Sequence, residues 1–354
     1  MIAVTDINAI WRIKPFMALS QSTPVTGVSP RQWLNGDPAC LPRERSTLAI
    51  SRISLPPGWA SRFAGYSARR IFDLLERIDA DRLFITSPHY LPLARIAAPR
   101  MSLHYYCSDD YSQYDGWGGT KIESRETELL ALCERSFFVS RHLVEKAVQR
   151  GANRAVLQIS PNATDLDRFG RGSDSNHEAV RNFLGCLKRP VVGIVGAINS
   201  RIDFELLNAC IELEEVGSLV MVGPVASGFV SPSWERLLTH PKCVMTGERP
   251  HGEIPAWMEE IDVALIPYSD TPFNRSCSPM RLFDHLGAGK PIVATSACDQ
   301  IREFDDHLCR GESLEEVLEL IRKQCRDPLS PSREPDFLAG ISWQNRAKSI
   351  LDSL

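Results

Sequence analysis

The sequence predicts an α/β protein of two doubly wound domains, each a parallel sheet covered by helices, that face a central cleft. Two observations support this prediction: short apolar runs alternate with longer amphipathic stretches, and one polar segment interrupts the alternation near the middle. At 354 residues the chain is long enough for two domains of ordinary size. Ligands of open α/β sheets bind beyond the carboxyl ends of the strands, so we expect the functional residues there.

The first half alternates apolar runs with amphipathic stretches. The runs that predict strands are residues 2–6, 24–28, 83–87, 101–106, 136–140 and 155–160. Amphipathic stretches at 61–78 and 124–134 predict helices between them. This order is typical of a parallel sheet with helices on both faces.

The alternation stops at residues 161–179, which are rich in Asn, Asp, Ser and Gly, and this composition predicts a linker. It restarts afterwards. The further strands and helices are predicted at 190–196, 204–216, 218–224, 242–247, 254–261, 262–268, 278–291 and 291–296. We therefore expect an N-terminal domain at 1–165, a C-terminal domain at 176–335, and a closing helix within 336–354 whose main role is packing, with the domain boundary as one place for it.

Composition and cysteine spacing narrow the class of protein. The chain is 43% hydrophobic and 24% charged, as expected for a globular protein. Its ten cysteines contain no CxxC pair, and no secretory signal is recognised, so we expect a reducing, cytoplasmic location. No apolar run approaches the ~20 residues that would cross a bilayer.

The first 70 residues are basic although the whole chain carries a formal charge of −4. They contain nine Lys and Arg residues but only three acids, Asp6, Asp37 and Glu44. A solvated surface explains this excess, and so does a surface that approaches anionic lipid or a phosphorylated acceptor, where each base contributes about 1 kcal/mol. Both interpretations stay open.

The segment SPMRLFDHLGAGKP, residues 278–291, predicts a helix in front of a buried strand, with Ser278 as N-cap and Pro279 at the first position. Arg281 then falls in the first turn, where the helix dipole disfavours a base by ~0.3–1 kcal/mol. A diphosphate held between the helix start and this guanidinium would explain that placement. Asp284 lies on the same face, so an ordinary Arg–Asp pair within the helix is the alternative.

Two nucleotide-binding motifs are absent. The GAGK run at 287–290 lacks the glycine and the Ser or Thr that a phosphate loop requires, and GIVG at 193–196 lacks the spacing of a dinucleotide fingerprint.

The chain resembles sugar-nucleotide glycosyltransferases of the GT-B fold, which has two Rossmann-like domains, in the large and mostly retaining group 1. The segments that carry the resemblance are ISPNATDLDRF (159–169), VVGIVGAINSRIDFELL (191–207), VMVGP (220–224), VMTGERPHGEIPAWMEEIDVALIPY (244–268), CSPMRLFDHLGAGKPIVAT (277–295) and SWQNRAKSIL (342–351). In the first half, LHYYCSDDY (103–111), 126–147 and 7–19 are similar to parts of the acceptor domain. The resemblance is strong from 159 to 295 and weak before 100.

The resemblance implies donor-binding residues in the second domain. Gly196 would allow close approach of the diphosphate, which Arg281 would neutralise. Ser278 and the backbone of Met280, Arg281 and Leu282 would bind phosphate oxygens. Asp284 would accept hydrogen bonds from the ribose, and Gly247 and Arg249 would flank the base. Arg201 is the one candidate for the basic residues that many relatives carry after the glycine loop.

The sequence departs from the family pattern at one acid. Many relatives have two glutamates eight residues apart, the first of them near the sugar, and here Ser276 takes the first position. The sugar and the stereochemical outcome are therefore not predicted.

Three aspartates at strand ends are the candidates for the acceptor side: Asp6, Asp109 and Asp110. One of them would orient or deprotonate the acceptor hydroxyl, with Asp110 as the leading candidate, although capping of a following turn is the ordinary use of such residues. The adjacent pair Asp109–Asp110 is a poor metal site, and we expect neither a metal nor another cofactor. His104, within a strand, is expected in the core.

The helix near residue 11 suggests a further partner. Trp11, Phe16 and Met17 lie close to Arg12 and Lys14, which would suit a lipid-linked acceptor at the inner face of a membrane, with core packing as the more common alternative.

The sequence thus predicts a glycosyltransferase of hexosyl or related sugars that acts in cell-surface polysaccharide or glycolipid biosynthesis. The expected partners are a nucleotide-sugar donor and a glycan or lipid-linked acceptor, with peripheral contact at the inner membrane face and no nucleic acid. The alternatives are a sugar-nucleotide epimerase of the same fold and a non-catalytic protein that binds nucleotide sugars.

Overall fold

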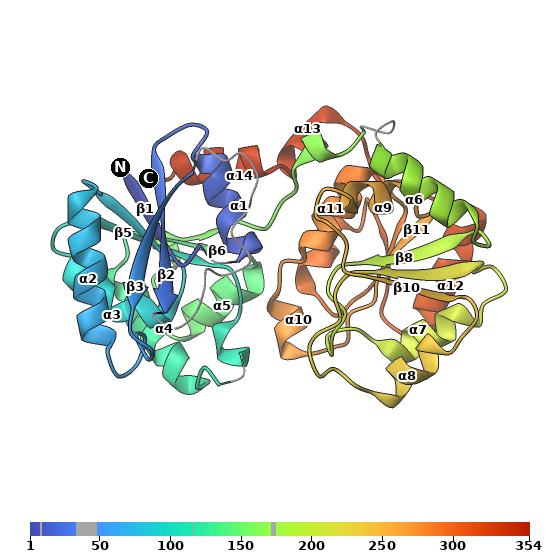
Figure 1. The fold of residues 1–354 in the computed structure, drawn as a ribbon, viewed down its shortest axis with the longest axis horizontal. Coiled ribbons are helices and arrows are strands. Elements are labelled where there is room, and N and C mark those ends of the chain that lie inside the picture. Colours follow the sequence, from blue (N-terminus) through green and yellow to red (C-terminus); the bar gives the residue numbers. More distant parts are fainter. Residues whose placement is uncertain (8, 33–47, 115, 171–174) are drawn as a thin grey trace. The chain divides into compact units, whose positions relative to one another are not determined.

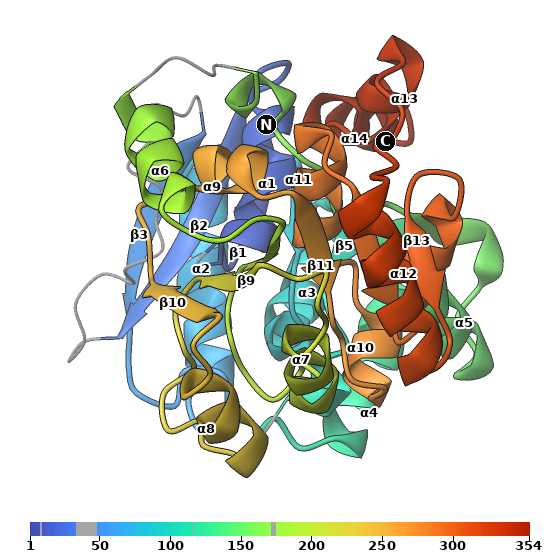
Figure 2. The same ribbon diagram turned by 90° about the vertical axis from the view of Figure 1, so that its right-hand side faces the viewer.

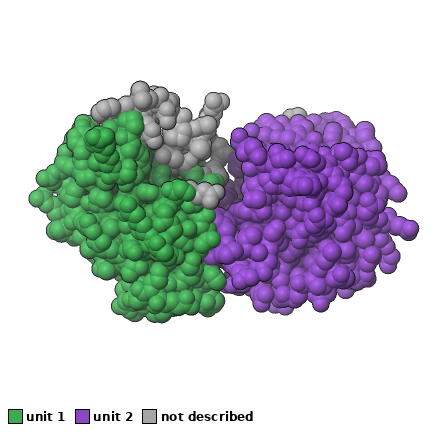
Figure 3. Space-filling view, turned by 90° about the horizontal axis from the view of Figure 1, so that it is seen from below, with its two compact units in different colours: residues 1–162, 343–354 green, residues 163–342 purple. Residues whose placement is uncertain are grey.

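The structure is a computed structural model that describes residues 1–7, 9–32, 48–114, 116–170 and 175–354 (Figure 1). It divides into two compact units (Figure 3). Unit 1 contains residues 1–162 and 343–354, and unit 2 contains residues 163–342.

Unit 1 is built on a seven-stranded sheet in the order β3-β2-β1-β4-β5-β6-β7, and every neighbouring pair is parallel. The strands are β1 (Ile2–Thr5), β2 (Val25–Gln32), β3 (Ala49–Leu55), β4 (Arg82–Ile85), β5 (Ser102–Cys107), β6 (Arg135–Phe138) and β7 (Leu157–Ile159). The order reverses between β1 and β4, so the loops after these strands lie at a topological switch point, where α/β sheets bind ligands.

The helices of unit 1 cover this sheet with regularly spaced apolar residues. They are α1 (Ile10–Leu19), α2 (Ala64–Arg77), α3 (Leu91–Ala97), α4 (Thr120–Leu132) and α5 (Arg141–Gln149), with short 3₁₀ turns at Pro88–Tyr90, Tyr111–Gln113 and Arg154–Val156. Phe16 of α1 meets Phe84 of β4 and Tyr106 of β5 edge to face, with ring centroids 5.2 and 5.4 Å apart. Such pairs add stability beyond the apolar area that they bury.

Unit 2 repeats the design with a six-stranded sheet in the order β10-β9-β8-β11-β12-β13. Its strands are β8 (Val191–Val195), β9 (Ser218–Val222), β10 (Cys243–Gly247), β11 (Val263–Ile266), β12 (Ile292–Thr295) and β13 (Cys309–Gly311). All five neighbouring pairs are parallel. Strands β8 and β9 are buried along their whole length, which fits helices on both faces.

Two apolar cores lie on the two faces of this second sheet. The helices of unit 2 are α6 (Ser175–Gly185), α7 (Phe204–Ile211), α8 (Pro232–Leu238), α9 (Ile254–Glu260), α10 (Pro272–Ser276), α11 (Met280–Ala288), α12 (Leu314–Arg326) and α13 (Pro335–Gly340). One core takes Leu184, Trp257 and Phe283 from α6, α9 and α11. The other takes Leu207, Trp234 and Ile321 from α7, α8 and α12. Figure 2 shows α6, α9 and α11 on one side of the unit and α7 and α8 on the opposite side.

The predicted linker is shorter than expected. Helix α6 begins at Ser175, inside the predicted linker 161–179, because His177, Val180 and Leu184 are buried and anchor a helix there. Residues 171–174 lie outside the described residues. Strands β3 and β13 and helices α3, α8, α10 and α12 were not predicted from the sequence.

The closing segment separates into two helices that belong to different units. Helix α13 lies in unit 2, whereas α14 (Trp343–Leu351) belongs to unit 1 and packs against α1 (Figure 1). Trp343, Ala347 and Ile350 are buried, as the predicted apolar face requires. In the described part of the chain, no helix combines the length and the apolar character that a bilayer crossing requires.

The core of unit 2 contains an uncharged histidine. His285 of α11 is fully buried, and neither ring nitrogen has a hydrogen-bond partner among the described residues. Burial lowers the pKa of His285 to about 3, and the charges of Arg281 and Lys290 act in the same direction. The ring therefore stays neutral in the folded protein.

His285→Phe should reduce the loss of stability in acid. As the pH falls below 6.5 the unfolded chain protonates this histidine while the folded chain does not, so the wild type should lose about 2 kcal/mol from this residue between pH 6.5 and 5. The phenylalanine variant lacks that contribution. Urea unfolding at pH 7 and pH 5 measures the difference, and His251→Phe, at an exposed position, is the control. Equal pH dependence in wild type and His285→Phe would contradict the prediction.

Candidate functional site

The predicted donor residues of unit 2 gather at the carboxyl ends of its strands. Gly196 and Gly223 begin the loops after β8 and β9, and Gly247 is the last residue of β10; all three have positive φ. A Cβ atom on Gly223 would lie 2.2 Å from the carbonyl oxygen of Gly196, so this close approach of two loops requires glycine. Hydrogen bonds from Gly196 N to Val222 O (2.8 Å) and from Gly223 N to Gly247 O (2.9 Å) hold the three loops together.

Arg281 extends from the first turn of α11 to the loop after β8. A Cβ atom on Gly196 would lie 2.7 Å from its Nη2 atom, and Nη2 donates a hydrogen bond to Ala197 O at 3.2 Å. Its Nη1 atom is buried and has no partner among the described residues. One edge of the guanidinium is thus fixed by the loop, and the other retains an unused donor.

Helix α11 begins one residue later than predicted. Met280 is its first residue, Pro279 is the N-cap without a side-chain cap, and Ser278 precedes the cap, so the prediction of Ser278 as N-cap is wrong. Proline takes that position because its fixed φ, here −71°, fits the extended backbone of an N-cap. Leu282 N donates to Pro279 O at 3.1 Å, so the helix start leaves the amides of Met280 and Arg281 as the candidate anion donors.

A second guanidinium lies close to the same point. Arg201 and Arg281 both approach the ring of Tyr268, at 5.1 and 5.4 Å from its centroid. Arg201 also lies 4.4 Å from the ring centroid of Phe273, and its Nε donates to Asn274 Oδ1 at 2.7 Å. Burial raises the pKa of Tyr268 although the two arginines act in the opposite direction, so the ring remains a neutral phenol.

Asn274 of α10 organises this arrangement and was not predicted. It is fully buried, and its Nδ2 donates to Arg201 O (3.0 Å) and Ser269 O (2.8 Å). Ser276 stands where many transferases that the sequence resembles have a glutamate. It is buried, and its hydroxyl donates a hydrogen bond to Pro272 O at 3.0 Å. The signal in the sequence was the short TPFNRSC turn, where Thr271 caps α10.

Asp284 lies on α11 and accepts a hydrogen bond from Thr164 Oγ1 at 2.5 Å. Thr164 is fully buried and forms an isolated bridge with Ser342, so Asp284 joins α11 to the segment that opens unit 2. The expected ribose contact of Asp284 stays a prediction.

Gly247 and Arg249 lie at the end of β10 and in the loop that follows. The guanidinium of Arg249 stacks on Trp257 of α9 at 5.4 Å, and its Nε is buried without a partner among the described residues. Their role beside a base stays a prediction.

In unit 1, Asp6 lies at the switch point after β1, and Asp109 follows β5; both belong to a cluster of polar and aromatic side chains around Arg12. Asp6, at a left-handed φ of 51°, accepts a hydrogen bond from Arg12 Nη1 at 2.8 Å. Arg12 also donates to Ser108 Oγ at 3.4 Å and lies 5.5 Å from the ring centroid of Tyr111. Burial opposes the charge of Arg12, but Tyr111 and Asp6, with Tyr114 and Asp109, raise its pKa above the ordinary value.

Aromatic residues that the sequence analysis missed surround Asp109. Tyr114 donates its hydroxyl proton to Asp109 Oδ2 at 2.7 Å. Trp117 stacks on Tyr111 with ring centroids 5.4 Å apart and meets His89 edge to face at 4.3 Å. The spacing of aromatic residues in YSQYDGW, directly after the two aspartates, was the available signal.

Asp110 has a structural role here. Its Oδ2 accepts from Lys146 Nζ at 2.7 Å, and its Oδ1 accepts from the Ser112 amide at 3.2 Å and hydroxyl at 2.6 Å, which caps the turn Tyr111–Gln113. Burial acts to raise the pKa of Asp110, but the bonds from Lys146 and Ser112 outweigh it and the pKa is lowered. A carboxylate held in this way is a weak base, which favours the capping alternative over the predicted catalytic role.

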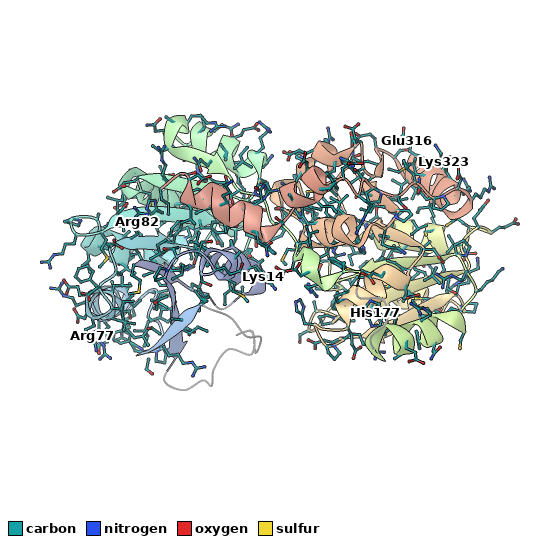
Figure 4. The ribbon with its side chains drawn as sticks, turned by 90° about the horizontal axis from the view of Figure 1, so that it is seen from above. Lys14, Arg77, Arg82, His177, Glu316 and Lys323 are labelled. Atoms are coloured by element: carbon teal, nitrogen blue, oxygen red, sulfur yellow. The ribbon has the colours of Figure 1, made fainter. Side chains whose placement is uncertain are left out.

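The basic helix expected at a lipid surface is part of the core. Arg12, Lys14 (Figure 4) and Phe16 of α1 are 7%, 5% and 0% exposed, so they cannot contact lipid as predicted. The helix lies between the sheet and α14, and Arg12 donates a hydrogen bond to Asp6. His104 is buried as expected, and burial lowers its pKa to about 4. The described residues contain no cluster of three or more His, Cys, Asp or Glu that could hold a metal ion.

No protein-family model matches the sequence. The chain is 34% identical over 177 residues to TuaH of Bacillus subtilis, named for glycosyl transfer in teichuronic acid biosynthesis, with 49% of this chain and 43% of TuaH covered. It is 27% identical over 209 residues to the 2-deoxystreptamine glucosyltransferase of Streptomyces kanamyceticus, with 56% of this chain and 52% of that protein covered. The chain thus spans about half the length of these curated relatives.

Solved structures match nearly the whole chain. HepE from Anabaena in complex with UDP matches with a TM-score of 0.76 at 14% identity, over 99% of this chain and 98% of HepE. WaaG, a glycosyltransferase of lipopolysaccharide biosynthesis, matches with a TM-score of 0.61 at 15% identity, over 100% and 96% of the two chains. The chain therefore has the GT-B fold that the sequence predicted.

Proposed function

We propose that the protein transfers a sugar from a nucleoside-diphosphate sugar to a hydroxyl acceptor, in cell-surface polysaccharide or glycolipid biosynthesis. The observation that carries this proposal is the convergence of Arg201 and Arg281 on Tyr268, beside the glycine loops and the start of α11. Two fixed cations and unpaired helix amides suit a diphosphate. The likeness to TuaH, and to HepE solved with UDP and with UDP-glucose, supports the same substrate class.

The chemistry at the donor is electrostatic. When the bond between the sugar anomeric carbon and the diphosphate oxygen breaks, the nucleoside diphosphate leaves with the electron pair and gains negative charge. The guanidinium of Arg281, the amides of Met280 and Arg281, and Arg201 would stabilise that charge. The Nη1 of Arg281, which has no partner among the described residues, is a donor that could serve this purpose.

The acceptor side needs a base for the hydroxyl proton, and we propose Asp109 for it. Both carboxylate oxygens of Asp110 are engaged by Lys146 and Ser112, and Asp6 balances the buried Arg12. Asp109 is half-buried at the end of β5, where Tyr114 orients one of its oxygens. The ion pair between Asp6 and Arg12 would then hold the positive charge of Arg12 in place near Asp109.

The proposed partners are a nucleotide-sugar donor and a glycan or lipid-linked acceptor, with the protein in the cytoplasm and in contact with the inner membrane face. A sugar-nucleotide epimerase or a non-catalytic binder would occupy the same donor site. Incubation with UDP-glucose separates the three: release of UDP supports transfer, an isomeric nucleotide sugar supports epimerisation, and binding without turnover supports the binder.

Arg281→Ala should lower UDP-glucose turnover by about 10²–10³-fold, since it removes a charged donor at the leaving group. It should also abolish the rise in melting temperature that saturating UDP gives to the wild type. Arg275→Ala is the matched control, because Arg275 lies on α10 but pairs at the surface with Asp270. Wild-type kinetics in Arg281→Ala would remove this residue from the site.

Asp109→Asn should reduce kcat at least about 100-fold while UDP still raises the melting temperature, because a general base contributes about 10²–10⁴-fold. Asp110→Asn should instead lower the melting temperature, since it removes the 2.7 Å ion pair of the half-buried Lys146 and leaves only Glu123 at 3.9 Å. If Asp110→Asn alone removed turnover in a protein of wild-type stability, the base would be Asp110.

Turnover should persist in excess EDTA, because arginines and helix amides can supply the positive charge that a metal ion provides in other transferases. UDP release measured with and without chelator tests this. A complete loss of activity that magnesium or manganese restores would contradict the proposed charge stabilisation.

A further inference from the structure

Large apolar side chains are exposed near the start of α2. Phe63 is 41% exposed and Tyr66 50% exposed. Ile50, 38% exposed, lies on the preceding strand β3. Scattered apolar side chains on a surface need no explanation, but exposed aromatic rings grouped with charge of one sign often mark an interaction site.

Positive charge predominates around these rings. Residues 45–72 contain five arginines and no Asp or Glu, and the acids of α2, Asp73 and Glu76, lie in its second half. Arg62, Arg69 and Arg70 lie in the same stretch as Phe63 and Tyr66 and are exposed. We call Arg62, Phe63, Tyr66, Arg69 and Arg70 the α2 patch. Helix α2 has no acidic residue in its first turn, so the positive end of its dipole adds to the field of the arginines.

Among the described residues, Arg62, Arg69 and Arg70 pair with no carboxylate, whereas surface arginines elsewhere, such as Arg95 with Glu128, do. Arg62 lies 5.6 Å from the ring centroid of Phe63, and Arg70 Nη1 lies 3.4 Å from the Tyr66 hydroxyl. The guanidinium groups thus lie against the exposed rings and keep most of their donors for an external anion.

We infer that the α2 patch binds the anionic phospholipid surface of a membrane. Arginine forks match lipid phosphates, and Phe and Tyr side chains insert at the boundary between headgroups and acyl chains. The combination favours a membrane over a purely polar polyanion, which would not need the rings exposed. The α2 patch would provide the surface for the membrane contact proposed above, in place of helix α1, whose basic residues are buried.

Vesicle co-sedimentation of the full chain tests the inference. Vesicles of phosphatidylcholine with 30–40% phosphatidylglycerol should bind the wild type, and vesicles of phosphatidylcholine alone should not. Raising the salt concentration from about 0.1 to 0.5 M should weaken binding, because the Debye length falls below its value of ~10 Å at 0.1 M and the exposed charges are screened more strongly.

Two variants separate charge from insertion. Arg62→Gln/Arg69→Gln/Arg70→Gln should weaken vesicle binding by about 100-fold, or about fivefold for each arginine. Phe63→Ala/Tyr66→Ala should also weaken it and abolish the blue shift of tryptophan emission expected from nearby Trp59. Arg77→Gln is the matched control, because Arg77 (Figure 4) lies at the far end of the same helix and bonds Asp73 O.

The outcomes are distinguishable from those of the proposed sugar transfer. All variants should keep wild-type melting temperatures and UDP-glucose turnover in vesicle-free buffer. Equal vesicle binding by the wild type and the triple variant would overturn the inference, as would binding that is competed by heparin and insensitive to Phe63→Ala/Tyr66→Ala. Vesicle binding by a protein that proves unable to turn over any nucleotide sugar would leave the α2 patch supported and refute the transferase alone.

Discussion

The candidate donor site depends on two like charges held against one aromatic ring. Arg201 and Arg281 both approach Tyr268, although like charges repel each other in a partly buried setting. Neighbouring groups compensate: Asn274 accepts from Arg201, the carbonyl of Ala197 accepts from Arg281, and the ring face attracts both cations. An anion of two charges would relieve the remaining repulsion. A site that is already assembled before the anion arrives loses little free energy to reorganisation when charge develops on the leaving group.

The glycines explain why such a site can exist at these strand ends. Gly223 brings its loop so close to Gly196 that any side chain would collide with backbone, and Gly196 lies under the Arg281 guanidinium. Both residues have left-handed φ values of 146° and 128°, which a side chain would strain. The backbone geometry therefore positions the arginine, and the arginine in turn covers the backbone. This mutual dependence is why the glycine loop and the α11 arginine were predictable together from one family pattern.

The sequence predicted what is local and missed what depends on tertiary contacts. The buried strands β8 and β9 are continuous apolar runs, and Gly196, Arg281 and Asp284 fall within one recognisable pattern. Asp110 looked like a base because its partner Lys146 lies 36 residues away and no local pattern connects them. Arg12 looked like a lipid contact because a sequence does not show that α14, from the far end of the chain, covers the same helix. Asn274 and Tyr268 contact Arg201, which lies more than 65 residues earlier in the sequence, so residue spacing alone could not reveal their roles.

The replacement of an acid by Ser276 follows from the same charge arrangement. A carboxylate at this position would lie two residues from Asn274, next to the group that orients Arg201, and would compete with a diphosphate for that guanidinium. The serine hydroxyl instead donates a hydrogen bond to Pro272 O within the short helix α10, and Asn274 Oδ1 accepts from Arg201 Nε. In the proposed site a diphosphate would then meet no carboxylate at position 276, and a sugar hydroxyl would lack that acceptor. If the protein transfers a sugar as proposed, a group other than the side chain at position 276 must recognise the sugar hydroxyl that similar transferases hold with a glutamate.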